Sequence, residues 1–434
     1  MRRYLAPLLL AAACDRGGPP PHAAEALAAD APPHAAAPAC APDNGGLTLP
    51  AGFCAVIFAD SVGSPRHIAV APGGVVYVAL QVPKRFGSEK GSTAAGGVLA
   101  LRDRDGNGRS DEVDGFGQHG GTGVAVAPGF LYVDEGDEIT RYPIAPGQLK
   151  PSGAGQVIVS GLPKGGHEAR NIVLDGRGGL LVNVGSLSNS CQQNDRGNGS
   201  PGDNPCTELE TRAGVWRFDA NRAGQRFTPA ARWATGIRNA MGLTRNPADG
   251  RIYTTQHGRD QLFQNWGRFY NAQQGAELPA EEFMQVNAGD DFGWPYCYYD
   301  QYQSKLVLAP EYGGDGKATG QCANKKAPVA AFPGHWAPMA SMFYTGSQFP
   351  ARYRGGAFIT FHGSWNRAPL PQQGFRVVYQ PMAGGRASGK YETFADGFRA
   401  GGHRPVGLAL APDGGLYVTD DARGRIYKIV YTGR

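Results

Sequence analysis

The stretch RHIAVAPGGVVYVA, at residues 66–79, decides the fold of this chain. Apolar and small side chains alternate along it on both sides of a Pro-Gly-Gly turn, which is the pattern of a β-hairpin. The same phrase returns five more times along the chain. The copies read GTGVAVAPGFLYV from Gly121, ARNIVLDGRGGLLVNVG from Ala169, RNAMGLTRNPADGRIYTTQHG from Arg238, more loosely SMFYTGSQFPARYRGGAFITFHGS from Ser341, and RPVGLALAPDGGLYVTDD from Arg404.

Six hairpins in one chain predict an all-β fold, a six-bladed β-propeller with one blade for each copy. The apolar strand GFCAVIFA from Gly52 has no hairpin of its own, so we expect it to pair with GRIYKIVY from Gly424 and close the ring. Two packed β-sandwiches are the alternative. The composition agrees with either, because 65 Gly and 33 Pro among 434 residues are too many for a helical bundle.

The first 14 residues, MRRYLAPLLLAAAC, carry two arginines, a short apolar run and small residues before a cysteine. The run is too short to span a bilayer, so residues 1–14 are interpreted as an export signal. Its end resembles a lipoprotein cleavage site with Cys14 as the lipidated residue, and an ordinary secretory signal is the alternative. We expect the Ala/Pro-rich residues 15–46 to form a disordered tether and residues 47–434 to form the propeller, on the periplasmic side of a bacterial cell envelope.

Seven cysteines are an odd number, and a lipidated Cys14 would leave six. Six cysteines allow 15 pairings, so the sequence alone does not determine the connectivity. An exported chain meets an oxidising compartment, which favours disulfides. Pairing nearest neighbours predicts three short loops, closed by Cys40–Cys54, Cys191–Cys206 and Cys297–Cys322.

The residues that open the repeats should meet, because the innermost strands of a propeller all begin around one mouth of its channel. Apart from two histidines in the tether, every histidine lies at such a junction. His167 follows a pair of glycines, and a histidine held in this way can act as a general base near neutral pH. Arginine presents a planar fork to carboxylates, so a multiply anionic ligand could be held by four arginines near the junctions: Arg238, Arg259, Arg367 and Arg404.

Several motifs together resemble one family, the pyrroloquinoline quinone (PQQ) dependent soluble glucose and sorbosone dehydrogenases, which are six-bladed propellers. They occur in order from about Leu49 to the end of the chain. The matching stretches are GGHEARN at Gly165, VGSLSNS at Val184, GIRNAMGL at Gly236, HGRDQL at His257, GDDFGWPYCYYD at Gly289, FYTGSQFP at Phe343, GGAFITFHGSWNR at Gly355 and RPVGLALAPDGGLYVTDD at Arg404.

The resemblance implies PQQ-dependent oxidation of a sugar or polyol hydroxyl, with PQQ and Ca²⁺ bound at the channel mouth. His167 would remove the hydroxyl proton while hydride passes to the quinone. Because the chain has no Cys-x-x-Cys-His haem motif, the electrons would pass to a separate quinone or cytochrome. The implied cofactor contacts are Arg238 and Arg404, with Asn239 and Gln118 as hydrogen-bonding partners and His362 or Arg367 as a further cation; the implied calcium ligands are the carbonyls of Gly258 and Arg259.

Two other functions compete with this one. The first is a non-catalytic envelope propeller that binds a glycan or a protein, and the second is a metal-dependent hydrolase that uses the ring of histidines. A net charge of +5 is too small to suggest nucleic-acid binding, although it suits an anionic small molecule. Binding of PQQ would separate the leading function from both competitors.

Two further segments leave alternatives open. The insertion from Gln261 to about Gly334 is expected to cover the channel mouth, and its aromatics could stack on a sugar or the quinone, or pack beneath the loop. The stretch DRDGNGRSDE at residues 103–112 matches the start of a calcium loop, with Asp114 at the twelfth position. We favour a polar hairpin tip there over a structural calcium site. The aromatics of the insertion are Trp266, Trp294, Tyr296, Tyr298 and Tyr299.

Overall fold

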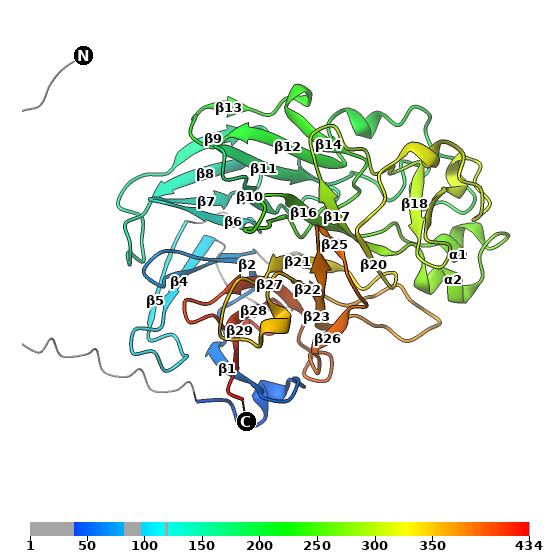
Figure 1. Cartoon of the computed structure of the whole chain (residues 1–434). Coiled ribbons are helices and arrows are strands. Elements are labelled where there is room, and N and C mark those ends of the chain that lie inside the picture. Colours follow the sequence, from blue (N-terminus) through cyan, green and yellow to red (C-terminus); the bar gives the residue numbers. More distant parts are fainter. Residues whose placement is uncertain (1–38, 82–96, 118–119, 434) are drawn as a thin grey trace, which may run out of the picture. The chain divides into compact units, whose positions relative to one another are not determined.

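The computed structural model describes residues 39–81, 97–117 and 120–433, and Figure 1 shows that its sheets radiate around a common centre. Six sheets form the blades of a β-propeller, which confirms the predicted fold class. Every strand pairing within the blades is antiparallel except one short parallel pair at the outer edge of the second blade.

The first three blades use residues 65 to 235. The first contains β2 (Pro65–Val70), β3 (Val76–Leu80), β4 (Gly97–Arg102) and β5 (Glu112–Phe116). The second contains β6 (Val124–Ala127), β7 (Phe130–Asp134), β8 (Glu138–Pro143), β9 (Gln156–Ser160) and the edge strand β13 (Gln225–Arg226). The third contains β10 (Ile172–Leu174), β11 (Gly179–Val184), β12 (Gly214–Asp219) and β14 (Arg232–Thr235).

The last three blades follow the same plan. The fourth contains β15 (Thr244–Arg245), β16 (Ile252–Gln256), β17 (Glu281–Val286) and β20 (Ala330–Phe332). The fifth contains β21 (Pro338–Phe343), β22 (Ala357–Phe361), β23 (Arg376–Gln380) and β26 (Glu392–Ala395). The sixth contains β27 (Pro405–Leu410), β28 (Leu416–Asp420), β29 (Arg425–Tyr431) and β1 (Phe53–Ala59). Each repeat of the sequence forms the innermost hairpin of one blade, as predicted.

The remaining elements lie mostly in the insertion of the fourth blade and in loops. The helices are α1 (Leu262–Trp266) and α2 (Ala272–Glu277), and two-stranded ribbons are formed by β18 (Cys297–Asp300) with β19 (Lys305–Leu308) and by β24 (Met382–Ala383) with β25 (Arg386–Ala387). Short 3-10 helices span Asn44–Gly46, Thr207–Glu210, Pro229–Ala231, Pro310–Tyr312, Gly320–Asn324 and Ala351–Tyr353.

The ring closes through the first strand of the described chain. β1 pairs antiparallel with β29, in a register that places Phe53 opposite Tyr431 and Cys54 opposite Val430. The last blade therefore takes three strands from the C-terminal end and one from the N-terminal end, as predicted. This pairing links the two ends of the folded chain within one blade, which packs face to face against the first blade.

Six of the apolar clusters among the described residues each lie between two neighbouring blades. Each sheet buries both of its faces against its neighbours, so most of its strands have few exposed positions. The largest cluster joins the fifth and sixth blades and contains Phe53, Phe349, Phe358 and Phe394. Since every blade is stabilised only by the next one, the sheets are stable as a closed ring.

His67 is one of the residues that line the central channel. The imidazole Nδ1 lies 2.7 Å from the Thr122 carbonyl, and Nε2 lies 3.0 Å from the Met339 carbonyl and 3.2 Å from that of Met241. One side chain thus contacts backbone from three other blades. The channel, of about 460 Å³, is lined mainly by apolar side chains from the innermost strands of all six blades.

Three disulfides join Cys40 to Cys54, Cys191 to Cys206 and Cys297 to Cys322, which confirms the nearest-neighbour pairing. The first of them attaches residues of the predicted tether to the propeller, and the Ala41 amide donates to the Ala55 carbonyl at 2.8 Å. The folded region therefore begins a few residues before the predicted boundary at residue 47.

The predicted export signal, Cys14 and the tether up to residue 38 lie outside the described residues. Within the part of the chain that the structure describes, no helix has both the length and the apolar character needed to cross a bilayer.

Removing the Phe53 ring should weaken the closure of the propeller. Its ring makes edge contacts with Phe349 and Phe394, with ring centroids 4.8 and 5.1 Å apart. Phe53→Ala should lower the free energy of unfolding by about 3–5 kcal/mol, measured by urea denaturation, because a large buried ring is replaced by a cavity. The control Val113→Ala, at a side chain that is 60% exposed, should stay close to the wild type. If the Phe53 variant were as stable as the wild type, the packing of β1 would not contribute to closure of the propeller.

Candidate functional site

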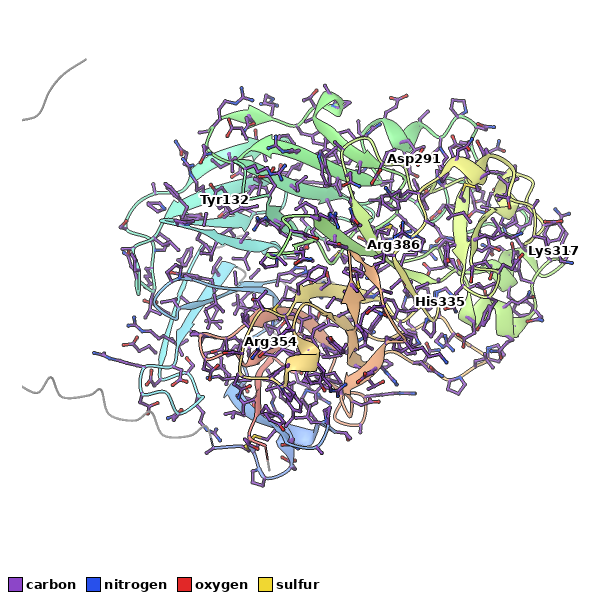
Figure 2. The ribbon with its side chains drawn as sticks, viewed as in Figure 1. Tyr132, Asp291, Lys317, His335, Arg354 and Arg386 are labelled. Atoms are coloured by element: carbon purple, nitrogen blue, oxygen red, sulfur yellow. A yellow bond between two sulfur atoms is a disulfide. The ribbon has the colours of Figure 1, made fainter. Side chains whose placement is uncertain are left out.

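Loops at one mouth of the propeller enclose a polar cavity of about 210 Å³. They come from the third, fourth and fifth blades and from the segment after Cys191. His335, labelled in Figure 2, belongs to this wall, and its Nε2 donates to the Gly275 carbonyl in α2 at 3.0 Å. The cavity is lined by His167, Arg196, Arg238, His257, Gly258, Asp260, Glu281, His335, Ala337, Trp365 and Asn366.

The carboxylate of Asp260 organises the cavity wall. Oδ2 lies 2.9 Å from Arg196 Nη2 and 3.1 Å from Arg238 Nη2, while Oδ1 accepts a hydrogen bond from the Asn366 amide. Burial opposes ionisation of Asp260, but the charges of Arg238, His335 and Arg196 hold the pKa of its carboxyl well below the usual range. Asp260 is therefore an anion that holds three segments of the chain together.

The guanidinium of Arg238 is buried and bonded on all sides within the protein. Nε donates to the Asn189 carbonyl at 3.0 Å, Nη1 donates to the Gly258 carbonyl at 2.9 Å, and Nη2 also reaches the Asn189 side chain. Arg238 lies in the cavity wall as expected, but its hydrogen bonds are already made. Its contribution to a bound anion is therefore mainly its charge.

The tautomer of His167 follows from its neighbours. Nδ1 lies 3.0 Å from both the carbonyl and the hydroxyl oxygen of Ser186, and that hydroxyl donates to the Ser188 carbonyl at 2.7 Å. Nδ1 must therefore carry the proton and donate, which leaves the lone pair on Nε2. Burial, assisted by the charge of Arg238, lowers the pKa of His167 to about 3, so the ring is neutral.

Glycines hold His167 in this position. Gly166 has φ +62°, and a Cβ there would lie 2.5 Å from the Leu187 Cα. A Cβ on Gly185 would lie 2.4 Å from the His167 carbonyl oxygen. The motifs around Gly165 and Val184 thus pack backbone against backbone, and a larger residue at either position would displace the histidine.

Glu281 adds a buried carboxyl to the same wall. Its two oxygens accept from the backbone amides of Gly258 at 3.0 Å and Ala337 at 3.2 Å. Burial raises the pKa of Glu281 to about 8, so at neutral pH the carboxyl is mostly protonated. Two guanidinium cations then face one carboxylate, and the cavity carries a net positive charge suited to an anion.

A second polar network lies beside the cavity. Asp421 pairs with Arg66 and accepts from His362 Nε2 at 2.8 Å, which joins the first, fifth and sixth blades. Burial opposes ionisation of Asp421, but the interactions with His362 and Arg66 hold its pKa at about 2. The predicted cation His362 is thus held by this carboxylate and is not part of the cavity wall.

Arg404 differs from the other cations predicted to contact the cofactor. Among the described residues, no carboxylate lies within ion-pair range of its guanidinium. Nε donates to the His362 carbonyl at 3.0 Å and Nη2 to the Gly363 carbonyl at 2.6 Å, while the guanidinium lies 5.3 Å from the Phe375 ring centroid. No described residue accepts from Nη1. The half-buried guanidinium is therefore oriented by backbone and stacking, and it keeps a donor for a ligand.

The structure does not bring every predicted residue to the cavity. Arg367 is buried, with Nη1 on the Gly334 carbonyl at 2.9 Å and Nη2 on the Glu277 carboxylate, so it anchors the loop of Asn366 to α2. Asn239 lies behind the wall, where its amide is 3.5 Å from His257 Nδ1. Gln118 lies outside the described residues.

The carbonyls predicted to bind calcium are only partly available. The Gly258 carbonyl already accepts from Arg238, so a cation on the remaining lone pair of this oxygen would lie beside a guanidinium of like charge. The Arg259 side chain points away into a buried ion pair with Glu311. As arranged here, this loop fits a calcium ion poorly.

The aromatics of the insertion are mainly packing residues. Trp266, Trp294 and Tyr298 are each about 95% buried, and the Trp294 indole donates to the Asn189 carbonyl at 3.1 Å. The exposed aromatic at the cavity is instead Trp365, which is 65% exposed. It occurs in the motif at Gly355, in which only His362 and Arg367 were predicted to be site residues.

Comparison with known proteins places this geometry in a family. A family profile described as TrAA12-like matches residues 47–432. The chain is 30% identical over 206 residues to an uncharacterized protein of Borreliella burgdorferi, covering 46% of this chain and 48% of that protein. It is 29% identical over 235 residues to a pyrroloquinoline quinone-dependent pyranose dehydrogenase of Coprinopsis cinerea, covering 45% of this chain and 30% of that enzyme. The matches thus span less than half the length of these curated relatives.

Solved structures agree on the fold. The PQQ domain of the Coprinopsis cinerea pyranose dehydrogenase, in its holo form, superposes with a TM-score of 0.68 at 20% identity, covering 92% of this chain and 99% of that domain. A calcium structure of Trichoderma reesei family AA12 superposes with a TM-score of 0.69 at 17% identity, covering 89% and 97%. These comparisons confirm the resemblance to PQQ-dependent sugar dehydrogenases noted from the motifs.

Asp421→Asn should destabilise the protein in a pH-dependent way. The folded pKa of about 2 lies below the ordinary value of 3.8, so the carboxylate contributes stability above pH 4 that is lost as the pH falls toward 2. We expect a loss of about 2–4 kcal/mol at pH 7, measured by urea denaturation, and a smaller difference from the wild type at pH 3.

Glu392→Gln provides the control, since its ion pair with Arg352 is about half exposed. It should change the free energy of unfolding by less than about 1 kcal/mol. An Asp421 variant as stable as the wild type at pH 7 would show that the network does not join the blades.

Proposed function

Because the chain belongs to the TrAA12-like family, we propose that it is a PQQ-dependent oxidoreductase that oxidises a hydroxyl of a sugar or polyol. The observation that carries this proposal is the cavity in which a neutral histidine, whose Nε2 has no partner among the described residues, faces a wall of net positive charge. A sugar oxidation needs a proton acceptor and a hydride acceptor in the same place. The protein provides the first, and the cofactor provides the second.

The cavity fits the anionic character of PQQ. Arg196 and Arg238 in its lining outnumber the single ionised carboxylate of Asp260, and Arg404, which is not among the lining residues, has a donor without a described partner. These arginines would hold the carboxylates of the cofactor, which supplies a quinone carbonyl that accepts hydride. Arg367 would act indirectly, by fixing the loop that carries Trp365 and Asn366.

His167 would take the substrate proton at Nε2. In the absence of a ligand, burial and the charge of Arg238 keep this nitrogen weakly basic. An anion bound near Arg238 offsets that charge and so raises the basicity of His167 when the cofactor is bound. Ser186 keeps the ring in the required tautomer, because its carbonyl holds the proton on Nδ1.

Two exposed apolar side chains flank the approach to His167. Trp365 is 65% exposed at the cavity, and Leu187 is 55% exposed next to Gly166. Aromatic faces stack on sugar rings, so Trp365 supports a carbohydrate substrate more strongly than the buried aromatics of the insertion do. No step of this mechanism is routed through calcium.

The cellular setting belongs to the same proposal. The three disulfides support an exported protein in an oxidising compartment. A lipid on Cys14 would hold the propeller at the periplasmic side of a bacterial membrane, where a quinone or a cytochrome could accept the electrons.

Reconstitution tests the proposal. Purified protein mixed with PQQ should bind the cofactor with a change in quinone absorbance and then reduce an artificial dye when an aldose or a polyol is added. Omitting PQQ is the control, and dye reduction should then be absent. If PQQ fails to bind with or without added Ca²⁺, the quinoprotein function is wrong and a non-catalytic glycan-binding propeller becomes the better account.

Two variants should separate the proton acceptor from the cofactor site. His167→Ala should lower kcat by roughly 10²–10⁴ while leaving PQQ affinity within a few fold, because it removes a general base only. Arg404→Ala should weaken PQQ affinity roughly tenfold or more, because it removes a charged hydrogen-bond donor. Titration of PQQ absorbance and steady-state dye reduction measure the two effects. Unchanged turnover in the His167 variant would remove this residue from the proposed role.

A further inference from the structure

The tip of the β4–β5 hairpin, far along the chain from the cavity residues, gathers three carboxylates. One oxygen each from Asp103, Asp105 and Asp111 lie within 4.8 Å of one another. Ca²⁺ binds oxygen ligands at about 2.3–2.6 Å, so two ligands on opposite sides of the ion are about 5 Å apart. The three carboxylates are therefore close enough to surround a single calcium ion.

One of these oxygens is buried without a donor. The Asp103 side chain is only 9% exposed, and its Oδ2 accepts from the Gly108 amide at 2.8 Å and lies 3.7 Å from Lys428 Nζ. Its Oδ1 is inaccessible to solvent and has no hydrogen-bond partner among the described residues. Leaving a buried carboxylate oxygen unpaired is costly, so this atom indicates a ligand other than the described residues.

The order of residues along the loop agrees with calcium. Asp103, Asp105 and Asp111 occupy the first, third and ninth positions, where calcium loops place side-chain ligands, with Asn107 at the fifth. Gly108 takes the sixth position with φ +90°, as the sharp turn of such loops requires. The Gly108 amide then fixes Oδ2 of Asp103 and leaves Oδ1 for the ion.

The twelfth position differs from a helix-flanked calcium loop. Asp114 lies on β5 and pairs with Lys150 at 2.7 Å, and Glu112 pairs with Arg102. Neither carboxylate turns toward the cluster. A calcium ion here would complete its coordination with the Arg109 carbonyl and water, which Ca²⁺ accepts readily.

The loop sits where the ring closes. The Ser110 amide donates to the Phe58 carbonyl of β1 at 2.8 Å, and Lys428 of β29 lies against Asp103. Figure 1 shows the cyan β4–β5 hairpin reaching toward β1. An apolar cluster that includes Phe58 and Leu101 joins the same two blades beneath it.

We propose that residues 103–111 bind one Ca²⁺ ion that stabilises the contact between the first and last blades. The ion neutralises the three carboxylates, satisfies the buried oxygen of Asp103 and fixes the hairpin against the strand pair that closes the propeller. This inference is independent of the proposed oxidoreductase function, since it concerns neither the cavity nor PQQ.

Calcium binding and thermal stability test the proposal on the full chain. Protein prepared without PQQ is stripped with EDTA, and bound Ca²⁺ is measured by equilibrium dialysis and atomic emission. The wild type should bind one more Ca²⁺ per chain than D105N/D111N. At a hundredfold excess over Kd, Ca²⁺ should raise the wild-type Tm by about 3 °C, and this rise should be absent in D105N/D111N.

D114N is the matched control, because its carboxylate lies on the same hairpin but pairs with Lys150. It should bind the same number of Ca²⁺ ions as the wild type. The wild type, D105N/D111N and D114N all keep residues 257–260, so an ion bound there adds equally to the Ca²⁺ count of each. Circular dichroism checks that D105N/D111N is folded, and if it is not, D105N alone should lower Ca²⁺ affinity at least tenfold. Equal Ca²⁺ stoichiometry and equal Tm shifts in the wild type and the Asp105 variants would overturn the proposal.

Discussion

The antiparallel pairing of β1 with β29 is the interaction on which the rest of the structure depends. Each sheet is buried only by its neighbours, so an unpaired last blade would expose apolar faces of the first and sixth blades. Closure also determines where the innermost strands begin, and therefore which loops meet at the channel mouth. A cavity built from three blades exists because the ring has no free end.

Asp260 holds the loops of the cavity together, as the pairing of β1 with β29 holds the ring together. A single buried carboxylate holds Arg196, Arg238 and Asn366, which come from separate loops. Buried charges are stable only when paired, so the segments must come together for any of them to be accommodated. The site is thus assembled before a ligand arrives, with the free nitrogen of His167 directed by Ser186.

Local patterns in the sequence predicted much of this fold and less of the site. Alternation and turn residues identified all six inner hairpins, and proximity along the chain was sufficient to pair the cysteines. Motifs singled out His167, which lines the cavity, and Arg404, which does not, because both stand near the start of a repeat. Arg196 carries no such signal, since its position depends on how the loop after Cys191 folds. The direction of the Arg367 side chain, toward Glu277, also depends on contacts between distant segments.

In the proposed function, the cavity bounded by His167, Arg238 and Asp260 binds PQQ with Nε2 of His167 toward the substrate. A crystal structure of the chain with PQQ bound tests this most directly. We expect PQQ in that cavity, with a carboxylate that reaches Arg404 and with Nε2 of His167 facing the space beside the quinone. PQQ bound elsewhere, or His167 turned to place Nδ1 toward that space, would contradict it.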